Sequence, residues 1–139
     1  LCYYQLSIFD QALVWHSNNY EHAKSLKDIN GYSIALNNIG LVHYKLTNYE
    51  LAVKNLSHSI SIKEEHGIMY DLDLAYINLA LATANTKNSD SLNTVHAREY
   101  IAKGMSSCEG GKCSGRIEIS ANFAYGSTYY LEDNFKEAI

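Results

Sequence analysis

The sequence predicts an all-α fold in which antiparallel helix hairpins stack into a solenoid. Three observations support this fold: the chain repeats itself at a fixed period, its apolar residues recur at helical spacings, and it contains no proline. The period is about 40 residues, within the range of roughly 20 to 50 residues that is typical of solenoid proteins. Because proline is absent, nothing in the chain forces a break inside a helix.

The repeat is clearest where residues 35–41, Ala-Leu-Asn-Asn-Ile-Gly-Leu, realign on residues 75–81, Ala-Tyr-Ile-Asn-Leu-Ala-Leu. In this alignment Asn38 matches Asn78, and both copies carry a small residue two positions later. A single helix hairpin cannot bury both of its apolar faces, so each unit must stack on a neighbour. Such arrays mostly present extended surfaces to partners.

The first unit is truncated. Its sequence aligns with that of the second unit at the same period, so that Ala12 matches Ala52. On this alignment the opening helix keeps about six residues, and a second helix is expected over residues 8–28.

The second unit contains the clearest helical pattern. Apolar residues at helical spacing predict one helix over residues 32–46 and another over residues 49–66. Asn48 stands where the N-cap of the second helix is expected. Gly67 is a natural stop for that helix.

The third unit repeats this theme with a longer turn. We expect a helix over residues 71–85, about five inserted residues within 87–93, and a second helix that ends near Ser106. The Gly-rich segment 108–114 is the best candidate for local disorder.

The fourth unit begins at residue 115 or 116. Asp133 and Asn134 are expected to form its turn, and Phe135 to open another helix. The whole chain is therefore expected to form one array, a piece of a larger protein, with repeats at residues 1–30, 31–67, 68–114 and 115–139.

Composition excludes some classes of function. The formal net charge is −4 and the pI is about 5.8, which argues against nucleic-acid binding because such surfaces are typically basic. No apolar run approaches the roughly 20 residues of a membrane-spanning helix.

The three cysteines leave two interpretations open. Cys108 and Cys113 flank a short Gly-rich loop, whereas Cys2 is distant in sequence. Free thiols and a cytoplasmic location are favoured, but a Cys108–Cys113 disulfide would imply an oxidising compartment such as the periplasm. Zinc is disfavoured because one Cys-x4-Cys segment supplies two of the four usual ligands.

The repeated motifs resemble those of the tetratricopeptide repeat (TPR) family, whose signature is W-x2-L-G-x2-Y followed by A-x3-F. The first motif is approximated at residues 36–43, 76–83 and 122–129, and the second at residues 52–56 and 97–101. The family's closing proline is missing, and the period is longer than the usual length of about 34 residues. The resemblance implies a right-handed superhelix. The long repeats look like those of bacterial signalling and transcription-regulatory proteins.

The family pattern has a physical reason in helix packing. A small residue on each first helix lets the second helix approach closely. These positions are held by Gly40, Ala80 and Gly126, and the reciprocal small residues on the second helices are Ala12, Ala52, Ala97 and Ala138.

The resemblance also implies a peptide-binding groove lined by the first helices. Family members often carry an asparagine near the small residue that bonds the ligand's backbone, and Asn38 and Asn78 occupy that place. An amide suits this task because it both donates and accepts hydrogen bonds. The same face is expected to include Asn37, Leu41, Tyr44, Lys45, Ile77, Leu81, Asn85, Phe123, Ser127 and Tyr130.

Alternatives exist for each of these residues. Asparagine is common in this chain, and the aromatic side chains could pack against a following unit. Lys45 is the one basic residue of the predicted face, which favours an apolar ligand segment over an acidic tail. His43 is expected to pack between helices, and residues 63–65 to form a solvated helix end.

We expect no enzyme activity, cofactor or metal site, because no nucleophile, phosphate-loop or metal-ligand spacing is found. The predicted function is protein or peptide binding, as a module of a larger signalling or transcription-regulatory protein. The alternative is a structural spacer or dimerisation scaffold without an external peptide ligand, and a homodimer is one such arrangement.

Overall fold

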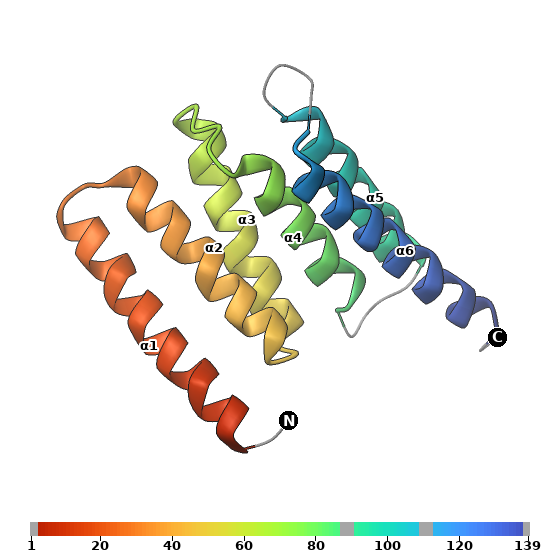
Figure 1. Cartoon of the computed structure of the whole chain (residues 1–139), viewed down its shortest axis with the longest axis horizontal. Helices are drawn as coiled ribbons and strands as arrows, with labels where there is room; N and C mark the ends of the chain where they lie inside the picture. Colours follow the sequence, from red (N-terminus) through yellow and green to blue (C-terminus); the bar gives the residue numbers. More distant parts are fainter. Residues whose placement is uncertain (1–2, 87–90, 109–112, 138–139) are drawn as a thin grey trace. The chain divides into compact units, whose positions relative to one another are not determined.

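The computed structural model describes residues 3–86, 91–108 and 113–137, and these residues form an all-helical structure (Figure 1). The all-α prediction is therefore confirmed. The helices of the described residues are α1 (Tyr3–Ser25), α2 (Ile29–Lys45), α3 (Tyr49–Glu65), α4 (Leu72–Ala84), α5 (Ser91–Ser106) and α6 (Gly115–Glu137).

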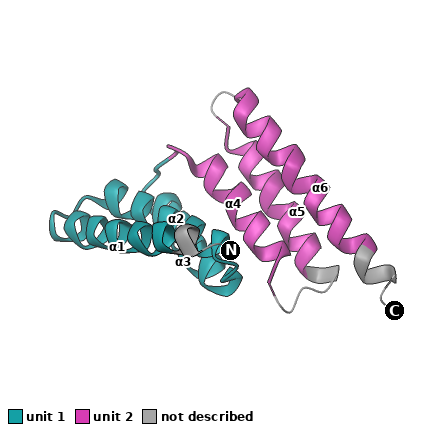
Figure 2. Cartoon of the chain, turned by 60° about the horizontal axis from the view of Figure 1, so that its bottom comes forward, with its two compact units in different colours: residues 1–68 teal, residues 69–139 magenta. Residues whose placement is uncertain are grey.

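The helices belong to two compact units, Leu1–Ile68 and Met69–Ile139 (Figure 2). In unit 1, α2 packs against both α1 and α3. In unit 2, α4, α5 and α6 all pack against one another. The division falls one residue from the predicted border between the second and third repeats.

The first three helices end in the same way, at evenly spaced positions along the chain. Lys27, Thr47 and Gly67 each follow a helix and have positive φ angles of 56°, 61° and 65°. The next amide in each case donates to a carbonyl five residues back: Asp28 to Ala23, Asn48 to His43, and Ile68 to Lys63. This is the Schellman motif, which satisfies carbonyls at a helix end. The predicted stop at Gly67 is confirmed.

The helix starts differ in how they are capped. Asp28 precedes α2, and its carboxylate accepts a 2.9 Å hydrogen bond from the Gly31 amide. Asn48 stands at the N-cap position of α3 as predicted, but its side chain makes no capping hydrogen bond.

Two predicted breaks are absent, because α1 and α6 are each continuous over 23 residues. No turn separates an opening helix from residues 8–25, and α6 runs through Asp133 and Asn134 to Glu137. A helix of about six residues is a poor nucleus by itself, whereas extending an existing helix adds one hydrogen bond per residue. Extension therefore prevails over the predicted turns.

The close approach of paired helices is confirmed at Gly40. A Cβ atom added there would lie 2.7 Å from Leu56 Cγ and 3.3 Å from the carbonyl oxygen of Ala52. Both α3 residues are fully buried. The glycine on α2 thus makes the space that the alanine and leucine of α3 fill.

Unit 2 has the same kind of contact between α4 and α5. Ala80 and Ala97 are fully buried in one core cluster, as the repeat pattern predicts. A further close approach was not predicted: a Cβ on Gly104 would lie 2.7 Å from the backbone oxygen of Asp73. A glycine of α5 therefore lets the two backbones approach.

The small-residue prediction is wrong for Gly126. This residue is exposed, and a Cβ built on it would have nothing within 4 Å. The face of α6 that packs on the rest of unit 2 carries Ile117, Ala121, Ala124 and Thr128 instead. Ala12 is half-buried, and Ala138 lies outside the described residues.

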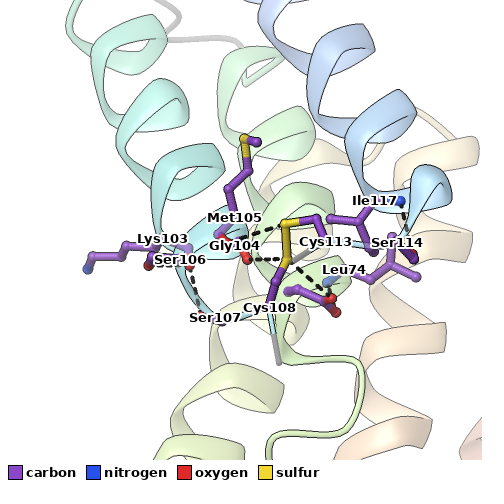
Figure 3. The surroundings of a disulfide bond; sticks show 11 residues. Leu74, Lys103, Gly104, Met105, Ser106, Ser107, Cys108, Cys113, Ser114 and Ile117 are labelled. Carbon is purple, nitrogen blue, oxygen red and sulfur yellow. Dashed lines mark hydrogen bonds between the residues drawn. A yellow bond between two sulfur atoms is a disulfide. The ribbon is translucent and has the colours of Figure 1, made fainter. Parts of the chain in front are cut away.

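The structure also corrects the prediction for one charged residue and decides between the two interpretations of the cysteines. Lys63 was expected to be solvated with Glu64 and Glu65, but its exposed fraction is 1%. For Cys108 and Cys113 free thiols were favoured and a disulfide was the open alternative, and the two residues form a disulfide between the end of α5 and the start of α6 (Figure 3). Parts of the predicted insertion at 87–93 and of segment 108–114 lie outside the described residues.

Substituting Gly40 and Gly126 by alanine should change the free energy of unfolding in opposite directions. Alanine in a helix interior is favoured over glycine by about 1 kcal/mol. Gly126→Ala should raise the free energy of unfolding by about that amount, because the new methyl group meets no atom. Gly40→Ala should lower it by about 1 kcal/mol, because crowding against Leu56 outweighs the gain. Urea denaturation of both variants checks this, and shifts of equal sign would contradict it.

Candidate functional site

The predicted contact residues lie on α2, α4 and α6, but they occupy two faces of these helices. Successive residues turn by about 100° around a helix, so neighbours in sequence point in different directions. One set of equivalent repeat positions, here called the asparagine strip of each unit, contains Asn38, Leu41 and Lys45 in unit 1, and Asn78, Leu81, Asn85 and Ser127 in unit 2. The other group, here called the pairing face, contains Asn37, Tyr44, Ile77, Phe123 and Tyr130.

The pairing face is where a first helix meets its second helix. Ile77 is fully buried and belongs to the core cluster that also contains Ile101 of α5. Its side chain therefore offers no surface to a ligand. Phe123 and Tyr130 stand at equivalent repeat positions on α6, but both are exposed.

Most residues of the asparagine strips are half-buried or exposed. Leu81 and Asn85 are half-buried on α4, where most other side chains are buried. On α2, Asn38 and Leu41 are half-buried and Lys45 is exposed. The strip of α2 belongs to unit 1 and that of α4 to unit 2.

Asn78 is the most unusual polar residue of the strip. Its side chain is 9% exposed, and its Nδ2 atom is buried without a hydrogen-bond partner among the described residues. A buried donor without an acceptor costs about 1–3 kcal/mol. No acceptor among the described residues offsets this cost, and because the atom is buried, an acceptor from another molecule can reach it only if the side chains that cover it move aside.

Other polar atoms near the strips are already bonded to their own helices. Asn85 Nδ2 donates to the carbonyl of Leu81 at 2.8 Å, and Ser127 Oγ donates to that of Phe123 at 3.0 Å. These two side chains therefore contribute less to ligand binding than the predicted set implied. Asn37 on the pairing face keeps a buried Oδ1 without a partner in the described part of the chain.

Aromatic rings and a cation gather at the C-terminal end of α2. The rings of Tyr44 and Tyr49 are 5.7 Å apart, and Lys45 Nζ lies 5.8 Å from the centre of the Tyr44 ring. Burial, with a smaller contribution from Tyr49, raises the pKa of the Tyr44 hydroxyl above its usual value.

Two hollows were not predicted from the sequence. One of about 450 Å³ in unit 2 is lined partly by Tyr70, Asp73 and Ser114, and it holds an ion pair of 3.6 Å between Asp71 and Arg116. Another of about 370 Å³ is a shallow surface on α1 beside Val14 and Trp15. No sequence motif signals the first, because its two sides are far apart in the sequence.

Metal and membrane sites were searched over the described residues. There, no three His, Cys, Asp or Glu residues come close enough together to hold a metal ion. None of the helices in those residues has the length and apolar character to cross a membrane.

Comparison with protein-family models, curated proteins and solved structures finds no match to this chain. The resemblance to the tetratricopeptide repeat therefore rests on the residues and motifs of the sequence itself. Any function proposed for the chain must be argued from its own surfaces.

His43 makes the stability of unit 1 depend on pH. Its Nδ1 atom is buried without a partner among the described residues, and burial lowers its pKa from the usual value of 6.5. The unfolded chain then binds more protons than the folded chain below about pH 6.5, so stability falls as the pH is lowered through this range.

The variant His43→Phe should reduce this pH dependence. It keeps an aromatic ring between the helices and removes the group that titrates. The free energy of unfolding, measured in urea between about pH 7.5 and 5, should fall less steeply in the variant than in the wild type. An unchanged slope would show that His43 does not contribute.

Proposed function

We propose that the chain is a TPR-like helical array that binds an extended peptide or protein segment through its asparagine strips. The repeat motifs support the array, since paired helices with small residues at a fixed period are the signature of that architecture. In this proposal Asn38 and Asn78 bond the backbone of the ligand, and Leu41 and Leu81 contact its apolar side chains.

The observation that carries the proposal is the unpartnered amide of Asn78. A buried Nδ2 without an acceptor destabilises the free protein, and a ligand carbonyl would remove that cost once the side chains over the amide move aside. A backbone amide group of the ligand offers a donor and an acceptor, as the asparagine side chain does. Asn38 stands one repeat earlier at the equivalent position and is half-buried.

The strips favour a ligand with apolar side chains. Apart from Lys45, the strip residues on α2 and α4 carry no charge. An acidic ligand would therefore find few cations to pair with. The proposed role is that of a binding module in a signalling or transcription-regulatory protein, a context that rests on the length of the repeat.

Peptide selection tests the binding function. The wild-type chain should enrich a consensus from a random display library, and the Asn38→Ala/Asn78→Ala variant should lose it. Losing both amides should weaken binding by at least about tenfold, since each hydrogen bond to the ligand contributes about 1 kcal/mol. The control is Asn18→Ala/Asn122→Ala, which removes two exposed amides outside the strips. Equal binding by all three proteins would contradict the proposed mechanism.

Stability provides a second readout for Asn78. Suppose that the Asn78 Nδ2 atom binds the ligand but destabilises the free protein. The Asn78→Leu variant should then bind the ligand more weakly, while the free energy of unfolding of the variant stays equal to that of the wild type or rises by about 1 kcal/mol. A large loss of stability would instead assign Asn78 a structural role. Thermal and urea unfolding of the ligand-free variant measure the difference.

A further inference from the structure

Two helices of this chain carry exposed apolar residues on faces that include positions buried elsewhere in the repeat, such as those of Ala12, Phe123 and Gly126. The α6 seam is defined here as Ile119, Phe123, Gly126 and Tyr130, and the α1 seam as Ile8, Ala12, Trp15 and Asn19. Both follow the spacing i, i+4, i+7, i+11, which is one continuous stripe along a helix. In the α6 seam, Ile119, Phe123 and Tyr130 are 72%, 65% and 69% exposed.

The α6 seam corresponds to the face of α4 that packs on α5. Aligning Gly126 with Ala80 places Ile119 at the position of Asp73, and Phe123 at that of Ile77. In α4 this face is covered: a Cβ on Gly104 of α5 would lie 2.7 Å from Asp73 O and 3.3 Å from Ile77 Cγ1. The α6 seam is therefore a first-helix face that lacks its second helix among the described residues.

Within the residues that the structure describes, the α1 seam lacks the opposite partner, a first helix. Ala12 is equivalent to Ala52 of α3 and to Ala97 of α5, and both of those residues are fully buried, whereas Ala12 is half-buried. Trp15 stands at the position of Tyr100, whose ring stacks on Tyr76 of α4 at 6.4 Å. Trp15 itself is 62% exposed. The α1 seam is therefore a second-helix face that lacks its first helix in the described part of the chain.

We propose that two copies of this chain associate head to tail, with α1 of one copy packed on the α6 seam of the next. Each seam supplies the helix type that the other lacks, so the contact would repeat the internal α4–α5 packing between molecules. This contact does not require the proposed peptide binding.

The packing at Gly126 explains why a small residue stands on an exposed helix. Glycine weakens a helix interior, and at this site nothing within 4 Å requires it. At the equivalent position of α2, Gly40 makes room for Leu56 and Ala52. In the proposed contact, Gly126 would make the same room for α1 of the neighbouring copy.

A contact of this kind joins two different surfaces, so it can propagate from one copy to the next. Sedimentation of the wild-type chain should show a mass that rises with concentration up to about 1 mM, the weak end of specific association. Trp15 is the one tryptophan of the sequence, and its emission should shift to shorter wavelength as it is buried. A monomer with unshifted emission over this range would overturn the proposal and leave the seams to other segments or proteins.

Two blocking variants test the pairing of the seams. Phe123→Asp removes the α6 seam and Trp15→Asp the α1 seam, so each variant alone should associate at least about tenfold more weakly than the wild type. Both residues are exposed, and circular dichroism verifies that the variants fold. The matched control is Val14→Asp, which is also on α1 and 63% exposed but outside the seam. It should associate like the wild type.

Mixing the two blocked variants separates head-to-tail contact from other modes. The Phe123→Asp protein keeps its α1 seam and its tryptophan, and the Trp15→Asp protein keeps its α6 seam. Their mixture should form a one-to-one dimer that does not grow, and the remaining tryptophan should shift its emission. No dimer in the mixture, or association of either variant with itself at wild-type strength, would overturn the proposal.

Discussion

The close approach of paired helices at small residues is the constraint on which the rest of the structure depends. Gly40 on α2 and the fully buried Ala52 on α3 let Leu56 fill the space between the two helices. Gly104 does the same between the backbones of α4 and α5. Because interiors are packed at crystal-like density, one added carbon at these places must displace a neighbour. Small residues that recur at a fixed period in the sequence therefore mark the positions where two helices pack closely.

This constraint explains why much of the fold could be predicted from the sequence. A helix pair with a small residue at each crossing needs a fixed length of chain, and the chain turns at the evenly spaced residues Lys27, Thr47 and Gly67. The helices over residues 32–46, 49–66 and 71–85 were predicted to within a few residues of α2, α3 and α4. The predicted bounds of the second unit place a turn at Thr47, but the Schellman geometry at Lys27 and Thr47 was not predicted, because neither residue is a glycine.

Two of the predictions that failed concern α6. Aligning α6 with α4 predicted a buried glycine at 126 and a turn at 133–134, but both depend on a second helix that would pack on α6. Without that neighbour among the described residues, the helix simply continues. The disulfide was left open for another reason: two cysteines this close in sequence are consistent with free thiols as well as with a bond, and proximity in the fold decides between them.

The candidate site was predicted in part. Repeat position placed Asn38 and Asn78 at equivalent sites on α2 and α4, but it could not separate them from adjacent positions such as Ile77, which lie in the helix pairing. That distinction needs the direction of each side chain, since neighbouring residues differ by about 100° around the helix. The unpartnered amide of Asn78 and the open seam of α6 likewise became visible only with the packing.

A double-mutant cycle between Gly40 and Leu56 tests the central constraint most directly. If contact with Leu56 is what forbids a side chain at position 40, Gly40→Ala should destabilise the wild type but stabilise the Leu56→Ala background, where the crowding atoms are gone. The expected coupling in the free energy of unfolding is about 2 kcal/mol. Equal effects of Gly40→Ala in both backgrounds would show that the two helices are not held at this distance by the glycine.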